Sequence, residues 1–128
     1  MSQVRNTLQR DLVREAMHEN YAHPTAEEIF SMIHAKHPHV SFATVYRNLN
    51  LLAEQGEISR LPMPEGPDHY DITTARHYHF LCKKCHRIID TDIPYADNFD
   101  HIAPEGCTTE GHILTLLGVC ADCQNENN

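Results

Sequence analysis

Residues 41–56 read Ser41-Phe42-Ala43-Thr44-Val45-Tyr46-Arg47-Asn48-Leu49-Asn50-Leu51-Leu52-Ala53-Glu54-Gln55-Gly56 and predict an amphipathic helix. Val45, Leu49 and Leu52 fall on one stripe at helical spacing. Ser41 stands where an N-cap belongs, and Gly56 stands where a C-cap glycine belongs. The opposite face carries hydroxyl, amide and guanidinium groups that can bond base edges and phosphates: Thr44, Tyr46, Arg47, Asn48 and Asn50. This face is either an ordinary hydrated surface or a DNA-reading surface.

Two further helices are expected before this one. Leu8, Leu12, Ala16 and Met17 recur at helical spacing, with Thr7 as the N-cap. A second helix begins at Thr25-Ala26-Glu27-Glu28, which has the capping-box pattern. It presents Ile29, Phe30 and Ile33 on one face and ends before Pro38.

A short β-hairpin is expected after the third helix. Its apolar positions are Ile58 and Leu61 in the first strand and Tyr70 and Ile72 in the second. The prolines and glycine of residues 61–67 exclude a continuous helix between them. Three helices followed by a hairpin predict a winged helix-turn-helix, which favours the DNA-reading interpretation of residues 41–56.

Composition limits the remaining possibilities. The chain has 128 residues, of which 22% are charged and 41% are hydrophobic, so it forms one compact unit or two very small ones and is too short for a large multidomain enzyme. The formal charge of -8 gives no general affinity for DNA. Residues 1–61 hold six basic and seven acidic residues, whereas residues 62–128 hold four and eleven. Because the sequence shows no signal peptide or membrane-spanning segment, we expect a cytoplasmic protein.

Two matched cysteine pairs lie in the second half, Cys82-Lys83-Lys84-Cys85 and Cys120-Ala121-Asp122-Cys123. This spacing predicts a closed zinc site of four thiolates with a structural role. The alternative is a pair of redox motifs, but neither pair opens a helix after a strand in a βαβ context. Cys107 is left over and is expected to be a partly buried small residue.

A second group of potential ligands surrounds the first pair. His77 and His79 point to the same face of an extended strand, and Asp71 and Asp90 lie before and after them. Mixed nitrogen and oxygen donors suit iron or manganese better than an all-sulfur site does. The alternative is that the two histidines are one face of an exposed strand.

The sequence resembles the ferric uptake regulator family of bacterial metal-dependent repressors, and within it most closely the peroxide-sensing branch. The resemblance rests on motifs that span nearly the whole chain in order: residues 22–29 (Ala22-His23-Pro24-Thr25-Ala26-Glu27-Glu28-Ile29), residues 41–49, residues 77–85, residues 87–90 (Arg87-Ile88-Ile89-Asp90) and residues 118–123.

This resemblance implies an α+β homodimer, in which a winged-helix DNA-binding domain (1–68) precedes a small α/β dimerisation domain with the four-cysteine zinc site (69–128). It implies structural Zn2+ on Cys82, Cys85, Cys120 and Cys123. A regulatory Fe2+ or Mn2+ is implied between the domains on His23, Asp71, His77, His79 and Asp90. The predicted DNA-binding residues are Ser41, Thr44, Tyr46, Arg47 and Asn50.

The implied function is a metal-dependent repressor of a near-palindromic operator, with no catalytic activity, which senses peroxide through oxidation of His23 or His77. The chain resembles the peroxide sensors in carrying aspartate at position 90, whereas iron-responsive relatives tend to carry glutamate there. The main alternative is an iron- or zinc-uptake repressor. A small zinc-stabilised metalloenzyme and a zinc-ribbon interaction module are alternatives of other classes.

The sequence departs from the family pattern in three places. We expect the extra N-terminal helix of longer relatives, and with it some phosphate contacts, to be missing. His69 stands where a basic residue is frequent, which affects the contacts expected from the wing. A further metal cluster of other members has only His86, His101, Glu110 and His112 to draw on here.

Overall fold

The computed structural model describes residues 2–19 and 23–126. It divides into two compact units, Met1–Thr74 and Ala75–Asn128. The division falls after Thr74 and not after Asp68, because the strand that follows Asp68 completes a hairpin within the first unit.

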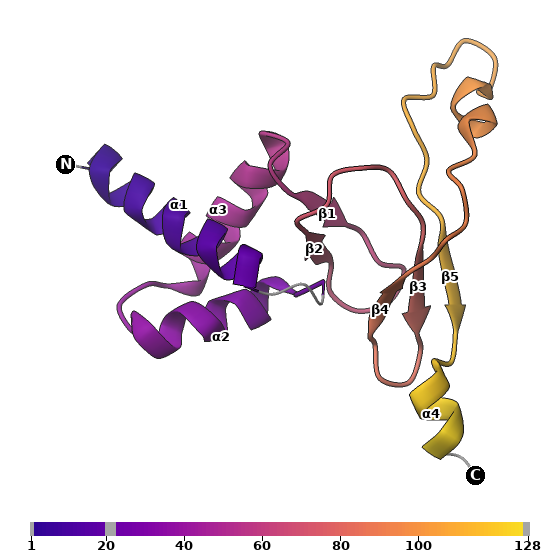
Figure 1. Cartoon of the computed structure of the whole chain (residues 1–128). Coiled ribbons are helices and arrows are strands. Elements are labelled where there is room, and N and C mark those ends of the chain that lie inside the picture. Colours follow the sequence, from indigo (N-terminus) through magenta and orange to yellow (C-terminus); the bar gives the residue numbers. More distant parts are fainter. Residues whose placement is uncertain (1, 20–22, 127–128) are drawn as a thin grey trace. The chain divides into compact units, whose positions relative to one another are not determined.

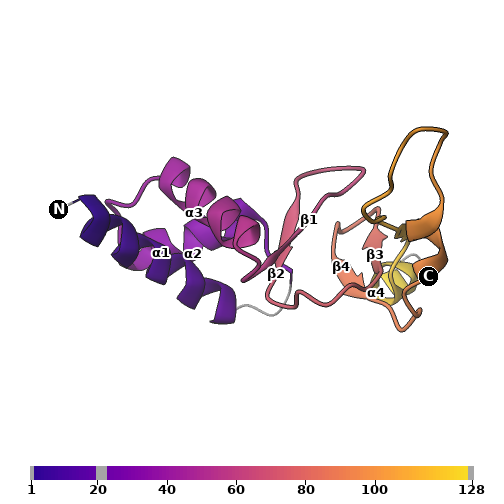
Figure 2. The same ribbon diagram turned by 90° about the horizontal axis from the view of Figure 1, so that it is seen from above.

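The first unit consists of three helices and a hairpin. The elements are α1 (Ser2–Glu19), α2 (Ala26–Lys36), α3 (Phe42–Glu54), β1 (Ser59–Leu61) and β2 (His69–Asp71), as Figure 1 shows. Each pair of helices is in contact, and Figure 2 shows the three from above. Their shared core includes Met17, Ile29, Val45, Leu49 and Leu52.

The caps of α2 and α3 are confirmed. The side-chain oxygen of Thr25 accepts a hydrogen bond of 3.2 Å from the Glu28 amide, and the Glu28 carboxylate accepts one of 3.0 Å from the Thr25 amide. Ser41 caps α3 by accepting from the Thr44 amide at 3.2 Å. Gly56 follows the helix with a φ of +78°, a conformation that favours glycine. These local bonds satisfy amides that would otherwise lack partners at the helix starts.

The predicted start of the first helix is wrong. Thr7 lies inside α1, which begins at Ser2. Leu8 is 61% exposed, and the buried stripe of this helix consists of Val13, Ala16 and Met17. The apolar spacing therefore did not locate the start of the helix, because the end of a helix need not coincide with its buried stripe.

The hairpin closes the first unit. β1 and β2 are antiparallel, with Ser59 opposite Asp71, Arg60 opposite Tyr70 and Leu61 opposite His69. An isolated antiparallel bridge between Thr25 and His69 joins β2 to the start of α2. The predicted winged helix-turn-helix is therefore confirmed.

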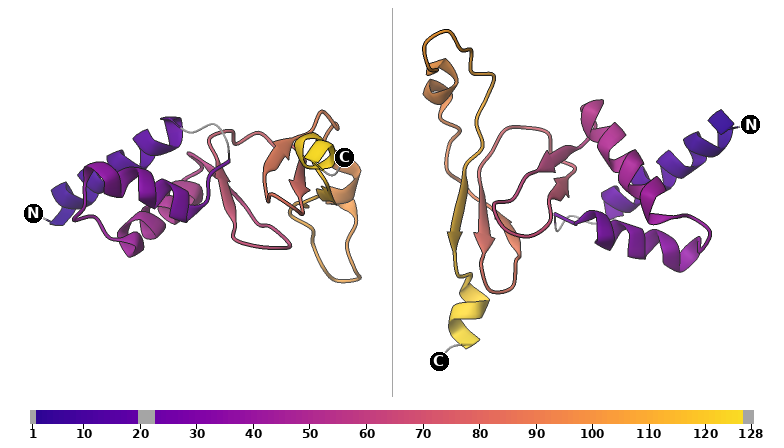
Figure 3. Two further views of the ribbon diagram at one scale, coloured as in Figure 1. Left: turned by 90° about the horizontal axis from the view of Figure 1, so that it is seen from below. Right: turned by 180° about the vertical axis from the view of Figure 1, so that it is seen from behind.

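The second unit contains a three-stranded sheet and short helical elements. The strands β3 (His79–Cys82), β4 (Ile88–Asp90) and β5 (Thr115–Gly118) are ordered β4-β3-β5, with β4 antiparallel and β5 parallel to β3 (Figure 3). A 3-10 helix (Asp97–His101) lies between β4 and β5, and α4 (Ala121–Glu126) follows β5. This mixed sheet and helix confirm the predicted α+β class.

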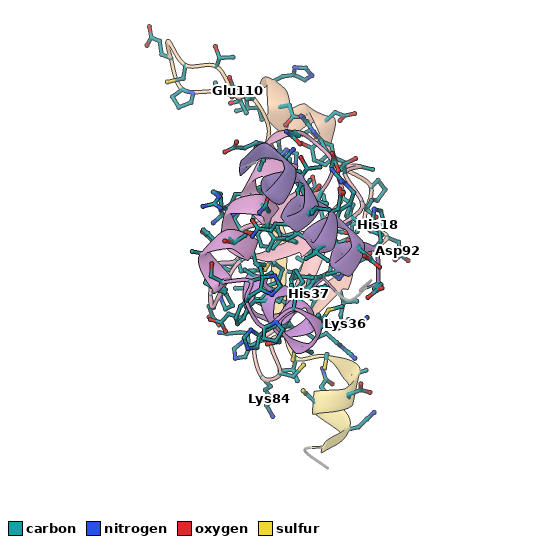
Figure 4. All side chains as sticks on the ribbon, turned by 90° about the vertical axis from the view of Figure 1, so that its left-hand side faces the viewer. His18, Lys36, His37, Lys84, Asp92 and Glu110 are labelled. Carbon is teal, nitrogen blue, oxygen red and sulfur yellow. The ribbon has the colours of Figure 1, made fainter. Side chains whose placement is uncertain are left out.

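The core of the second unit is small. One buried cluster consists of Cys82, Cys120 and Cys123, with Phe80, Ile89 and Val119 packed around them. Tyr78, Leu81 and Ile88 of this unit are buried as well. The segment from Ile102 to Leu114 has no regular structure, and Figure 4 labels Glu110 on it. In the first unit, Figure 4 labels Lys36, the last residue of α2, and His37, its C-cap. None of the helices in the described residues is long and apolar enough to cross a membrane.

Candidate metal sites and nucleic-acid interface

The four paired cysteines converge at one end of the sheet in the second unit. Cys82 ends β3, and Cys85 lies in the turn that follows it. Cys120 lies in the two-residue connection between β5 and α4, and Cys123 lies in α4. Because β5 runs parallel to β3, with Gly118 opposite Cys82, both cysteine pairs lie at the same end of the sheet.

Their spacing matches a tetrahedral metal site. The Cys82 and Cys123 sulfurs are 3.7 Å apart, and those of Cys85 and Cys120 are 3.8 Å apart. All four sulfurs lie within 4.8 Å of one another. A tetrahedral zinc ion with Zn–S bonds of 2.3 Å requires sulfurs separated by about 3.8 Å. The arrangement therefore suits a structural zinc ion.

Electrostatics support a thiolate cluster. The pKa of Cys82 is lowered to about 5, first because the Cys85 amide donates to its sulfur, and second because the Cys120 amide does so. The pKa of Cys123 is raised to about 12, chiefly by its hydrogen bond with Cys120 and then by burial. Four sulfurs this close cannot all ionise without a cation between them, and a divalent ion bound there would remove that penalty.

Cys107 differs from the prediction. It is exposed, in the turn after Gly106, and does not belong to the cluster. The expectation that it is partly buried was wrong, because the irregular segment around it has few apolar neighbours to cover it.

Two histidines and a carboxylate meet at the start of the sheet in the second unit. The rings of His77 and His79 lie 4.3 Å apart between centroids. Asp90 is the register partner of His79 across β3 and β4, and its Oδ1 lies 3.1 Å from His77 Nε2 and 3.3 Å from His79 Nε2. One carboxylate oxygen thus faces two imidazole nitrogens, as the alternation of the strand predicts.

A matching histidine–carboxylate pair lies in the first unit. His23 Nε2 is 3.4 Å from Asp71 Oδ2, and both side chains are buried. The Thr73 amide donates to Asp71 Oδ1 at 2.9 Å, which orients the carboxylate. The backbone of His23 has a φ of +54°, a conformation rare for residues other than glycine and common at functional sites.

His69 helps to position His23, a role that the sequence did not reveal. It is buried, and its Nδ1 lies 2.6 Å from the backbone oxygen of His23. The Tyr70 amide donates to the adjacent Pro24 oxygen at 2.8 Å. Together these bonds from β2 hold the loop that carries His23. The only sequence signal was the unusual histidine itself.

The five predicted regulatory ligands thus form two groups, His23 with Asp71 in the first unit and His77, His79 and Asp90 in the second. Each group combines imidazole nitrogen with carboxylate oxygen, and this donor chemistry suits Fe2+ or Mn2+.

The further cluster considered from sequence is not assembled among the described residues. His86, His101, Glu110 and His112 do not form a metal-binding group there. His112 instead stacks on Tyr95, with ring centroids 4.5 Å apart, and its Nδ1 lies 3.0 Å from Asp100 Oδ1. The pKa of Asp100 is lowered, first by this bond with His112 and then by its bond with Tyr95.

The outward face of α3 carries the predicted DNA-binding residues. Ser41 and Arg47 are exposed, Tyr46 is 39% exposed, and Thr44 and Asn50 are half-buried. Asn48 is a correction. It is only 4% exposed, and its Nδ2 donates to the Thr44 backbone oxygen at 2.9 Å. Its amide nitrogen is therefore engaged within the helix.

A groove of about 540 Å³ runs along this face. It is lined by Arg10, Tyr46, Arg47, Asn48, Asn50, Leu51 and Glu54. Among the residues that the structure describes, the guanidinium of Arg47 has no hydrogen bond or ion pair, in contrast to those of Arg14 and Arg60. An unpaired guanidinium beside hydroxyl and amide groups on a winged-helix reading helix suits DNA.

Known proteins resemble this chain along its whole length. It is 35% identical over 127 residues to the peroxide operon regulator of Bacillus subtilis, covering 98% of this chain and 88% of that protein. It is 32% identical over 127 residues to the peroxide-responsive repressor PerR of Staphylococcus epidermidis, covering 98% and 85%.

Solved structures agree. The Campylobacter jejuni peroxide stress regulator superposes with a TM-score of 0.69 at 28% identity, covering 95% of this chain and 93% of that one. The Helicobacter pylori ferric uptake regulator, described with three functional metal binding sites, superposes with a TM-score of 0.74 at 28% identity, covering 91% and 79%. The ferric uptake regulator family itself matches residues 1–117. The chain belongs to the ferric uptake regulator family.

Proposed function

We propose that the protein is a metal-dependent transcriptional repressor that senses peroxide through a regulatory Fe2+ or Mn2+ site. The observation that carries this proposal is the shared contact of Asp90 Oδ1 with His77 and His79, in a chain that also presents a DNA-reading helix. The peroxide regulators among its relatives support the choice of signal.

The regulatory ion would be held by His23 and Asp71 together with His77, His79 and Asp90. Bound Fe2+ would supply one-electron reduction of peroxide. The residues of the chain then determine the outcome. The imidazoles of His23 and His77 would lie within reach of the oxidant, and oxidation of either ring weakens the donor set. A ligand set shared by the two units would favour one arrangement of them, and losing a ligand would remove that preference.

DNA binding would use α3 in the major groove, with Ser41, Thr44, Tyr46, Arg47 and Asn50 facing the duplex.

We propose a homodimer as the binding species, acting in the cytoplasm where the DNA lies. β5 lies at the edge of the sheet, and Leu116 and Leu117 on it are 41% and 48% exposed. Pairing between two copies would cover this apolar edge. Twofold symmetry would then require a near-palindromic operator.

The direct test is selection of binding sites from duplexes with a randomised central segment, in the presence of Mn2+. We expect a near-palindromic site, bound with either Mn2+ or Fe2+. Peroxide should release only the Fe2+-loaded protein. Release by metal removal with no response to peroxide would instead indicate an uptake repressor of the same family. Failure to enrich any sequence would contradict the proposal.

The proposal assigns no catalytic turnover to the protein. A small metalloenzyme would need an open coordination position, whereas five protein ligands leave little room for a substrate. Steady consumption of peroxide by sub-stoichiometric iron-loaded protein would contradict this assignment.

A further inference from the structure

The side-chain amide of Asn50 on α3 is held in one orientation by residues outside the helix. Its Oδ1 accepts two hydrogen bonds, one from Arg60 Nη1 and one from the Tyr70 hydroxyl, each of 2.9 Å. Arg60 and Tyr70 are opposite one another on β1 and β2. The wing strands therefore hold the amide oxygen of a residue on the reading helix.

The identity of the held atom follows from chemistry. A guanidinium can only donate, so the Asn50 atom that faces Arg60 must be the carbonyl oxygen. The Tyr70 hydroxyl acts as the second donor. A carbonyl oxygen has two lone pairs, and both are now occupied.

Arg60 is itself held in place. Its Nε and Nη2 both lie 2.9 Å from Asp68 Oδ2, and Nη2 also donates to the Tyr46 hydroxyl at 3.3 Å. The Asp68 carboxylate also accepts from the Met63 amide at 3.3 Å, so the turn of the wing is part of the same network. The side chain that orients Asn50 thus has little freedom to release it.

The remaining polar atom of Asn50 is Nδ2, which has no hydrogen bond within the described part of the chain. Asn50 lines the groove along α3 together with Tyr46 and Arg47. Tyr46 accepts from Arg60 and so has its own hydroxyl proton to offer, and Arg47 can only donate. Three neighbouring side chains of the reading face therefore present donors.

We propose that Arg60 and Tyr70 are positioning residues that make Asn50 a donor-only reader of DNA. Asparagine usually reads adenine with both amide atoms, since Oδ1 accepts from N6 while Nδ2 donates to N7. Asn50 cannot make this pair, because its oxygen is already saturated. It therefore loses the bidentate preference for adenine and disfavours cytosine, which offers only a donor, so that guanine with O6 and N7 or thymine with O4 is preferred at its position. This inference rests on the proposed DNA-binding function.

The test is selection from the same randomised duplexes with Mn2+, using the full chain. Asn50→Ala identifies the base position that Asn50 reads, because the preference there should flatten. Asn50→Asp keeps an oxygen toward Arg60 and Tyr70 but replaces the outward donor with an acceptor. We expect the preferred base at that position to change from guanine or thymine to cytosine, whose N4 donates.

A second variant tests the positioning residues. In Arg60→Met/Tyr70→Phe the apolar bulk is kept, and both donors to Oδ1 are removed. The enrichment of adenine at the same position should rise by about tenfold or more relative to wild type, because the freed amide can bond both N6 and N7. If this double variant does not fold by circular dichroism, Tyr70→Phe alone is used, and a smaller rise in adenine is expected.

The outcomes separate the two hypotheses. If the wild-type protein enriches no site, the proposed function fails. If it enriches a site in which the Asn50 position already prefers adenine, the inference is overturned. It is also overturned if the donor-removal variant loses affinity with an unchanged base preference, because that result indicates a purely structural role for Arg60 and Tyr70.

Discussion

Replacing Cys82 with serine should unfold the second unit while leaving the first intact. Cys82 is completely buried, and its sulfur accepts from the Cys85 and Cys120 amides at 3.5 and 3.3 Å. Its pKa is lowered to about 5, chiefly by these two amides. Serine does not ionise at neutral pH, so the variant loses one of the four zinc ligands.

The magnitude follows from the size of the unit. Domains are stable by about 0.05–0.15 kcal/mol per residue, so roughly 50 residues contribute only about 3–8 kcal/mol. A structural zinc site contributes about 10–16 kcal/mol at neutral pH. The metal therefore outweighs the rest of the second unit, in which three of the ligands themselves form a buried cluster.

Zinc content by atomic emission and thermal unfolding by circular dichroism measure the effect. We expect no tightly held zinc, loss of one unfolding transition, and retention of the helical signal from α1, α2 and α3. Cys107→Ser is the matched control, since Cys107 is exposed and lies outside the cluster. Full zinc occupancy with unchanged melting in the Cys82 variant would refute the reasoning.

Three other predictions concern DNA and the regulatory ion. Arg47→Ala should weaken operator binding by roughly 1–3 kcal/mol, measured by fluorescence anisotropy, and should leave Mn2+ affinity unchanged, because Arg47 faces the groove and contacts no predicted ligand. Asp90→Asn should lower Mn2+ affinity in titration calorimetry while zinc content stays full, and equal affinity would remove Asp90 from the regulatory site. Dilute peroxide should add one oxygen to a peptide with His23 or His77 in the iron-loaded protein and spare His34. Equal oxidation in the manganese-loaded protein, detected by mass spectrometry, would argue against sensing through iron.

The features that the sequence predicted well depend on residues close together in the chain. The Thr25–Glu28 capping box and the Ser41 cap each involve residues three apart, and two-residue spacers bring each cysteine pair together. Such patterns carry their own geometry, because a helix or a tight turn fixes the distance between neighbours.

The failures have equally specific causes. Thr7 was chosen as a cap from the apolar stripe, but a helix can extend past the part that is packed. Asn48 was placed on the outward face, although it lies three residues after Val45 and four before Leu52 and so shares their buried side. Helical spacing alone could have identified Asn48.

The contacts of His69 and Arg60 could not be predicted in this way. His69 reaches the backbone of His23. Arg60 reaches Asn50 on α3, and it reaches Asp68 across the turn that contains the prolines. Their partners are decided by how the hairpin packs on the helices. Periodicity gives no register between separate elements, so such polar contacts emerge only from the assembled unit.

The acidic composition seemed to argue against DNA, and the structure explains why it does not. Two acidic residues of the first unit, Glu57 and Asp68, are paired with arginines, although Glu54 lines the groove along α3. Arg14 donates to both oxygens of Glu57, at 2.8 and 3.0 Å, and this bond holds the pKa of Glu57 below its ordinary value. Asp68 is paired with Arg60. No acidic residue stands between Ser41 and Leu51. The electrostatic field at a base edge is therefore set by the nearby donor groups of α3, since solvent and salt screen charges more than about 10 Å away.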